Sequence, residues 1–229
     1  MSDIHGHYKE FMQMLDKIAF SDDDELFILG DVIDRGPLPI TLLLYVLNHP
    51  NITLLMGNHE QMLLDAGKDD NWGEHTRSVW LAYGGTTTEK QLSSLDAKTA
   101  KKMMQDLRKL PYYKFIEVNE KKYLLSHAGV CIKDNEDIHI ALKRDVDSKR
   151  ILWNRHELLL WKNTSDVVMV HGHTPSGRYH PEHKFTIYSY EGDKKINIDC
   201  GCSCCENLGC LRLDDMTEFY VPCQKIWEF

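Results

Sequence analysis

The spacing of apolar and polar residues predicts alternating helices and strands in the N-terminal part of the chain. Residues 8–19 carry apolar side chains at helical spacing. The apolar run 26–29 has the length of a buried strand and stops at a glycine, and 52–56 repeats this arrangement. Between them, two prolines precede the apolar run 42–47, which is typical of a helix start. This β-α-β order predicts an α/β fold with a mainly parallel or mixed sheet.

The middle of the chain predicts helices. Residues 61–110 are mostly of helical pattern, with a loop at 68–71 and a glycine break at 84–85. Residues 133–160 return to charged, helical sequence.

The apolar pattern of the remaining segments, between residues 115 and 222, predicts strands. Segments 115–118 and 122–126 read as a hairpin around Asn119 and Glu120. Because no repeat or low-complexity linker interrupts the chain, we expect residues 1–229 to form a single domain. The remaining strands are predicted at 167–170, 184–190, 194–199, 208–213 and 218–222.

Composition narrows the classes of partner. A chain of 229 residues with 42% hydrophobic content can bury one substantial core. It has no apolar run near the length of a membrane span and does not open with a secretory leader, so we expect a cytoplasmic protein with no membrane partner. The net charge of −8 argues against a nucleic-acid surface. An acidic protein that handles phosphate needs concentrated local positive charge.

Three short motifs place polar side chains at or near the ends of predicted strands. They are D-I-H-G at 3–6, G-D-V-I-D-R-G at 30–36 and G-N-H-E at 57–60. Their oxygen and nitrogen donors, without thiolates, suit Mn, Fe or Zn. In the middle motif Arg35 follows Asp34 and is a natural phosphate clamp. These motifs predict a two-metal phosphoesterase site.

These motifs resemble the calcineurin-like metallophosphoesterases, in particular their bacterial phosphoprotein phosphatase branch. The family pattern is D-x-H, G-D-x-x-D-R-G, G-N-H-E, a single H, and G-H. Here the last two are S-H-A-G around His127 and H-G-H-T-P around His173, so five motifs occur in order from residue 3 to about residue 215. The resemblance implies an α/β fold with a metallophosphoesterase-type β-sandwich of mixed sheets flanked by helices.

The resemblance also implies a set of metal ligands. It predicts two divalent transition-metal ions, with Mn expected first and Fe or Zn as alternatives. Carboxylates suit the bridging position because each oxygen can serve one ion. The implied ligands are Asp3 and His5 for the first ion, Asp31 as the bridge, and Asn58, His127 and His173 for the second ion.

The same resemblance assigns the chemical roles. Two ions about 3.5–4 Å apart lower the pKa of a bridging water, which attacks phosphorus in line. Arg35 and Asn58 would hold phosphate oxygens. His59 would give a proton to the leaving alkoxide, and Asp34 would orient that imidazole. Arg155, in a W-N-R sequence that resembles the family's W-x-R element, is expected as a second clamp; the alternative is a helix-surface cation.

One departure affects the first metal site. Family members have an apolar strand of about five residues before D-x-H, whereas only Met1 and Ser2 precede Asp3 here. The first strand therefore looks missing, which leaves an internal start, a shortened chain or replacement by other pairing as explanations. Because chain ends are ordered only when tied down, we expect the Asp3/His5 site to be the weaker one.

Five of the seven cysteines fall within residues 200–210. Their spacing, C-x-C-x-C-C followed by a fifth, matches no standard zinc pattern. We interpret them as small, buried, reduced thiols in a strand-turn-strand segment. A thiolate metal or redox site is the alternative, and the spacing does not support a regulatory disulfide. His7, His171, His180 and His183 lie near motifs without matching ligand positions, so we expect them around the site or on the surface.

The substrate remains open between two enzymatic hypotheses. The favoured one is a serine/threonine protein phosphatase or broad phosphomonoesterase, acting on a phosphorylated protein or a small phosphoester. The rival is symmetrical hydrolysis of diadenosine polyphosphates, whose typical motif lacks the aspartate before the arginine; Asp34 therefore favours the phosphatase. A third hypothesis, a weakly active phosphate-recognition protein, would be supported by a lost ligand or a lost His59, and neither is seen.

Overall fold

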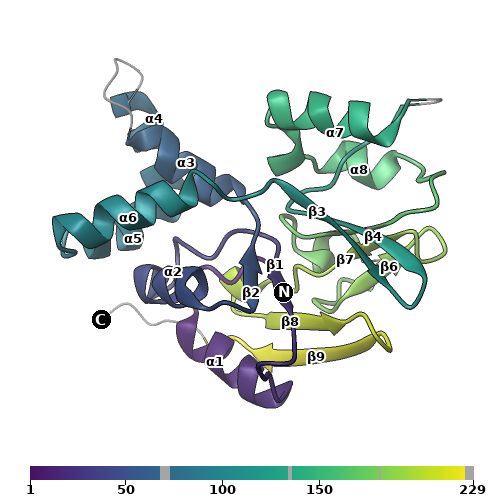
Figure 1. Cartoon of the computed structure of the whole chain (residues 1–229), viewed down its shortest axis with the longest axis horizontal. Coiled ribbons are helices and arrows are strands. Elements are labelled where there is room, and N and C mark those ends of the chain that lie inside the picture. The colour runs from purple at the N-terminus through teal and green to yellow at the C-terminus, as the bar shows by residue number, and fades with distance from the viewer. Residues whose placement is uncertain (68–72, 134–135, 181, 225–229) are drawn as a thin grey trace.

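The computed structural model describes residues 1–67, 73–133, 136–180 and 182–224 (Figure 1). The predicted loop at 68–71 lies outside these residues. The helices are α1 (Tyr8–Lys17), α2 (Pro39–Asn48), α3 (Asn58–Ala66), α4 (Gly73–Trp80), α5 (Thr86–Leu92), α6 (Ala97–Leu107), α7 (Ile138–Asp147) and α8 (His156–Leu160). The strands are β1 (Leu26–Ile28), β2 (Ile52–Leu54), β3 (Tyr113–Val118), β4 (Lys121–Ser126), β5 (Val168–His171), β6 (Tyr188–Tyr190), β7 (Lys195–Asn197), β8 (Asn207–Arg212) and β9 (Thr217–Pro222).

Local sequence explains where several elements begin and turn. Asp96 caps α6 by accepting the amides of Lys98 and Thr99, both at 3.0 Å. Asn119 and Glu120 have φ of 49° and 63°, the left-handed pair that a tight type I′ hairpin requires between β3 and β4. The predicted hairpin is therefore confirmed.

The central sheet is mixed and has five strands in the order β3-β4-β5-β7-β6. Its inner pairs, β4 with β5 and β5 with β7, are parallel, and both outer pairs are antiparallel. Two smaller sheets accompany it: the parallel pair β1-β2 and the antiparallel hairpin β8-β9. The predicted α/β class with a mixed sheet is confirmed.

Both faces of the central sheet are covered where β4 pairs with β5, so the paired residues 123–125 and 168–170 are apolar and buried. Leu124 and its neighbour Met169 face the larger core cluster, which also holds Leu142 of α7 and Leu158 of α8. The alternate residues of these strands face a second cluster with β1 and β7. Figure 1 shows α7 and α8 over the sheet and α3–α6 grouped beside β2, and α1 packs against β8 and β9. Among the described residues, no helix is long and apolar enough to cross a bilayer.

The first residues run beside β1 and end at a cavity. The Met1 ammonium donates to the Phe27 carbonyl at 3.0 Å, and the Leu29 amide donates to the Met1 carbonyl at 2.9 Å. This is the bonding of a parallel strand, so residues 1–3 lie where the family pattern places the end of the strand before D-x-H. A cavity of about 350 Å³ continues along β1 past Met1, and apolar side chains line much of it, among them Phe27, Leu125, Val170, Ile198 and Leu211.

We expect an apolar extension of about five residues ahead of Met1 to stabilise the protein. It would fill the cavity, pair with the open edge of β1 and remove a buried ammonium whose pKa is lowered by burial. A net gain of only ~1 kcal/mol would raise Tm by about 2–4 °C for a chain of this size. Thermal melts should show this shift. Metal titration of the two proteins should show tighter binding at the site of Asp3 and His5. A glycine-serine extension of equal length is the control, and an equal shift with it would contradict the prediction.

The cysteine-rich segment differs from our expectation of buried, reduced thiols. Cys202 forms a disulfide with Cys223, and Cys204 is exposed. The partner Cys223 follows β9, 21 residues further along the chain, so the spacing within 200–210 carried no sign of it. Cys200 and Cys210 are buried free thiols, as expected.

Candidate metal centre

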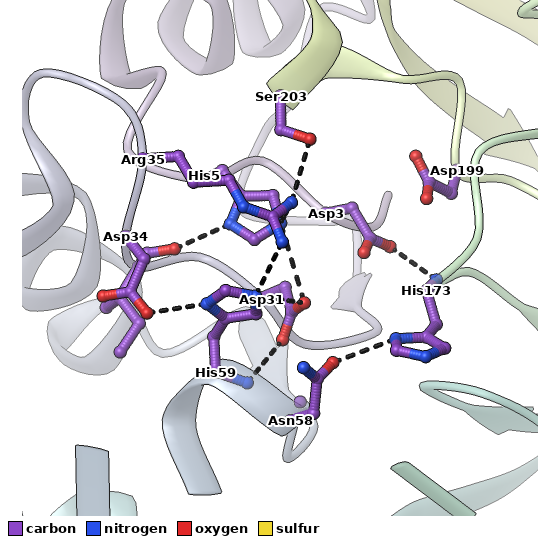
Figure 2. A network of polar contacts seen from close by, with 12 residues as sticks. Asp3, His5, Asp31, Asp34, Arg35, Asn58, His59, His173, Asp199 and Ser203 are labelled. Atoms are coloured by element: carbon purple, nitrogen blue, oxygen red, sulfur yellow. Dashed lines mark hydrogen bonds and ion pairs between the residues drawn. The ribbon is translucent and has the colours of Figure 1, made fainter. Parts of the chain in front are cut away.

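The predicted ligands meet where strand ends and loops converge. Asp31 follows β1, Asn58 opens α3 after β2, His127 follows β4 and His173 follows β5. Gly30 allows the first two loops to approach, because a Cβ there would lie 2.5 Å from the Cα of Gly57. Residues far apart in the sequence therefore face one another (Figure 2).

Two clusters of donor atoms share one carboxylate. His5, Asp31 and His59 bring ligand atoms within 4.8 Å of one another, and so do Asp31, His127 and His173. All of these side chains are buried. A carboxylate common to two clusters is the arrangement expected of a bridge between two cations.

Hydrogen bonds to carbonyls fix where the histidine lone pairs point. His5 Nδ1 lies 2.8 Å from the Ile33 carbonyl, and His127 Nδ1 lies 2.7 Å from that of Leu29. Because a carbonyl only accepts, each neutral ring carries its proton on Nδ1 and presents a lone pair on Nε2. His127 Nε2 points at the Asn58 Oδ1 at 2.7 Å. His173 Nε2 is buried with no hydrogen-bond partner among the described residues. Facing lone pairs and an orphaned ring nitrogen suit a cation.

Burial sets the protonation of this centre. It lowers the pKa of His5 well below its ordinary value, and the nearby charge of Arg35 adds to this. The pKa of His173 is lowered likewise, first by burial and then by His127 and Arg155. Both imidazoles are thus held in the neutral form that binds metals. Burial raises the pKa of Asp31 well above its ordinary value, so the metal-free pocket disfavours its charge.

Asp3 does not join the cluster of His5. Its Oδ2 accepts the His173 amide at 2.9 Å and the Ser2 hydroxyl, so the carboxylate turns toward the second cluster (Figure 2). Buried Asp199 lies on the same side, and its pKa is raised by burial and then by the charge of Asp3. Asp199 was not among the predicted site residues. It could have been found from the Asp-x-Gly sequence at 199–201, which follows the buried strand β7.

Arg35 lies across the first cluster. Its Nη1 donates to His5 Nε2 and its Nη2 contacts His59 Nε2, both at 2.9 Å. Its Nη1 also donates to the Ser203 hydroxyl at 3.1 Å, and its backbone amide donates to the Gly84 carbonyl at 2.9 Å. The glycine break predicted at 84–85 is a kink with Gly84 at φ 106°, and it supports this arginine.

His59 is held by a carboxylate with further partners. Its Nδ1 lies 2.6 Å from the Asp34 Oδ2, which also accepts the Trp80 indole N–H at 2.8 Å. The Thr88 hydroxyl donates to the other Asp34 oxygen at 2.5 Å. The imidazole therefore has a fixed orientation, with Nε2 directed at Arg35 and the Asp31 carboxylate.

Sequence reasoning missed the residues that support these groups. Trp80 and Thr88 orient Asp34, as described above. Glu60 accepts the amides of Asp31 at 2.8 Å and Val32 at 2.9 Å, and so anchors the loop that carries the shared carboxylate. Glu60 belongs to the G-N-H-E motif, so its presence was visible although its role was not.

Arg155 and two aromatic side chains lie at the margin of the centre. Arg155 is exposed and near enough to His173 for its charge to lower that pKa. The Trp153 ring lies 5.8 Å from the His173 ring and 6.2 Å from the ring of Tyr83. Both aromatic rings are partly exposed, at 36% and 46%.

Left-handed backbone recurs at the centre. Asp3, His5, Asp31, Asp34, Arg35 and His173 all have φ between 48° and 71°. Such geometry costs of order 1–3 kcal/mol for a non-glycine residue and persists only where the surroundings impose it. At these positions the surrounding contacts therefore impose the shape of the loops.

The fold and the convergent donors define a phosphoesterase that uses divalent metal ions. The calcineurin-like phosphoesterase family matches residues 1–199, and the chain belongs to this family. The family implies divalent metal ions, and the two clusters are able to hold them.

Relatives with two different enzymatic names are similar to this chain. The chain is 30% identical over 218 residues to Serine/threonine-protein phosphatase 2 of Salmonella typhimurium, covering 93% of this chain and 91% of the relative. It is 32% identical over 133 residues to the symmetrical Bis(5'-nucleosyl)-tetraphosphatase of Erwinia tasmaniensis, covering 57% of this chain but only 43% of that protein. A crystal structure provisionally described as a diadenosine tetraphosphatase superposes with a TM-score of 0.61 at 18% identity, over 97% of this chain and 91% of its own. That likeness supports the fold alone.

Proposed function

We propose that this protein is a serine/threonine protein phosphatase with a binuclear metal centre. The observation that carries the proposal is Asp31, the carboxylate shared by both donor clusters. His5 would serve one ion, and Asn58, His127 and His173 the other. Asp3 would turn from the His173 amide to complete the first set. Bound together, the two ions supply a water of lowered pKa and neutralise charge on the phosphate.

Arg35 would act as the phosphate clamp by leaving its present partners. Its hydrogen bond to His5 Nε2 uses the lone pair that the first ion needs. Metal binding at His5 and this hydrogen bond therefore exclude each other. The released guanidinium offers paired N–H donors to phosphate oxygens. Arg155 would add positive charge from the other side, and Asn58 would contact phosphate as well.

His59 would protonate the leaving alkoxide. Asp34 holds the Nδ1 proton and stabilises the charged ring, so Nε2 is free to carry the transferable proton. Once Arg35 turns to phosphate, Nε2 loses its present neighbour. His59 would not bind metal in this scheme, although it lies within the first cluster.

The identity of the metal ions is proposed from the ligand atoms, and the cellular compartment and the substrate are proposed with it. Oxygen and nitrogen donors without thiolates favour Mn²⁺ first, with Fe and Zn as alternatives. The expected setting is the cytoplasm, and the substrate is a phosphorylated protein or small phosphoester.

A second candidate function is symmetrical diadenosine polyphosphate hydrolysis. Tyr83 and Trp153 support it, because they form a partly exposed edge-to-face pair next to the His173 ring. Adenine stacks on such rings for about 1–3 kcal/mol per base. Asp34, which the typical motif of that enzyme lacks, argues for the first candidate.

One substrate panel tests both candidates. Metal-stripped protein should be inactive and should regain activity with Mn²⁺, at two ions per chain. We expect the highest kcat/KM on a phosphothreonine peptide, less on phenyl phosphate and least on diadenosine tetraphosphate. Trp153→Ala should then change the first two little. A preference for the dinucleotide that Trp153→Ala reduces by tenfold or more would instead establish the second candidate. Full activity in the presence of excess chelator would reject both.

A further inference from the structure

A third group of side chains that could hold a metal ion lies outside the two clusters of the candidate metal centre. His7, Cys202 and Cys223 are buried, and their ligand atoms lie within 4.8 Å of one another. They come from three separate parts of the chain: the residue before α1, the short turn Cys202–Cys204, and the residue after β9. The two sulfurs form a disulfide, with the Cα atoms 5.5 Å apart.

The surroundings of this group resemble those of a thiolate–imidazole metal site. His7 Nδ1 lies 3.6 Å from a carboxylate oxygen of Glu10, which is itself buried. Metal-binding histidines commonly have such a carboxylate beside the ring, because it orients the ring and raises its basicity. The other Glu10 oxygen accepts the Gln224 amide at 3.4 Å, which ties Glu10 to the segment that carries Cys223.

We propose that His7, Cys202 and Cys223 form a third metal site, for a thiophilic ion such as Zn²⁺, that opens when the disulfide is reduced. Two thiolates and one imidazole are a recognised three-ligand set for Zn²⁺, which leaves one position for water or another ligand. The chemistry separates this site from the centre at Asp31, whose ligands are all oxygen and nitrogen. In the oxidised form the sulfurs are bonded to each other and cannot serve as thiolate ligands.

The conversion needs an external reductant, and a dithiol of the cell would supply it. The dithiol gives two electrons and two protons to the Cys202–Cys223 bond, and closes to its own disulfide. Two thiols result. Zn²⁺ binding then displaces both thiol protons to solvent and forms two Zn–S bonds.

The site lies next to groups of the active centre. Cys202 Sγ is 3.7 Å from the Ile4 carbonyl, between Asp3 and His5 in the sequence. The following residue, Ser203, accepts a hydrogen bond from Arg35. A change of redox state or metal at this position would therefore alter the contacts of the Asp3–His5 loop and of Arg35, the phosphate clamp of the proposed function.

Cobalt spectroscopy on the full chain tests the proposal, with Co²⁺ alone as the probe. Thiolate-bound Co²⁺ has an intense near-ultraviolet charge-transfer band that a centre of oxygen and nitrogen ligands lacks. Reduction with a water-soluble phosphine, which is oxidised to its oxide, avoids added thiols. We expect no such band from oxidised protein, and after reduction a band that saturates at one additional ion per chain. Zn²⁺ should displace that ion and abolish the band.

Variants identify the ligands. Cys223→Ser should abolish the band, and His7→Ala should weaken Co²⁺ binding at this site by tenfold or more. Cys204→Ser, which changes an exposed thiol outside the group, is the matched control and should retain the band. Circular dichroism checks that each variant is folded. If a variant is unfolded, the comparison of the band in oxidised and reduced wild-type protein still tests the proposal. No band in the reduced protein at saturating Co²⁺, or a band that survives in folded Cys223→Ser, would overturn the proposal.

Discussion

His59→Asn should lower kcat on a phosphothreonine peptide by about 100-fold or more, because general-acid help contributes about 10²–10⁴. The imidazole is held by Asp34 at 2.6 Å, and that carboxylate is fixed in turn by Trp80 and Thr88. A ring so positioned delivers its proton at one place, which asparagine cannot do. On nitrophenyl phosphate the loss should be much smaller, because nitrophenolate departs without a proton.

Metal content separates this role from the alternative. Elemental analysis of His59→Asn should still find two ions per chain, although His59 Nε2 lies 3.9 Å from the Asp31 Oδ2 and within the first cluster. Loss of one ion would make His59 a ligand rather than the acid. His171→Asn is a matched control: His171 is equally buried, but its Nε2 contacts the Tyr190 hydroxyl at 2.9 Å, away from the centre. His171→Asn should leave the ratio of kcat on the phosphothreonine peptide to kcat on nitrophenyl phosphate unchanged.

The sequence predicted the parts of this site that depend on local pattern. A strand that ends at a glycine followed by a ligand recurs at Asp31 and, through Gly57, at Asn58. Because the strands of one fold layer end at the same edge, such residues were expected to converge. The structure brings Asp31 and Asn58 together with His127 and His173. Their roles as ligands remain predictions.

What the sequence did not predict depends on long-range pairing. Trp80 and Thr88 reach Asp34 from 46 and 54 residues away, and both lie in a segment for which the sequence predicted only helices with a glycine break. Cys223, which follows β9, likewise pairs with a residue 21 positions earlier in the chain. The position of Asp3 was also not predictable, since the terminal residues pair with β1 for only a short length and the carboxylate turns to the His173 amide.

Asp31→Asn should separate the stability of the metal-free protein from its metal affinity. In the folded protein burial raises the pKa of Asp31, and Glu60 and Asp3 add like charge. An acid with a raised folded pKa opposes folding once the pH exceeds its unfolded value, near 4. At neutral pH the metal-free wild type is therefore destabilised by a carboxyl group whose charge the folded pocket disfavours. Asparagine removes that charge, and its Oδ1 can still accept the His59 amide that Asp31 Oδ1 accepts at 3.0 Å.

The metal-free variant should accordingly melt at or above the temperature of metal-free wild type. The gain in Tm on adding Mn²⁺, which measures binding to the folded state, should largely vanish. Metal affinity should fall by more than about 100-fold, the upper range for residues that only support a ligand, because Asp31 touches both clusters. Asp199→Asn is the comparison: it removes another buried carboxylate of raised pKa that belongs to neither cluster, so it should keep the Mn²⁺ gain. An Asp31→Asn protein that binds two ions as tightly as wild type would show that Asp31 is no bridge, and the two-metal scheme would fall with it.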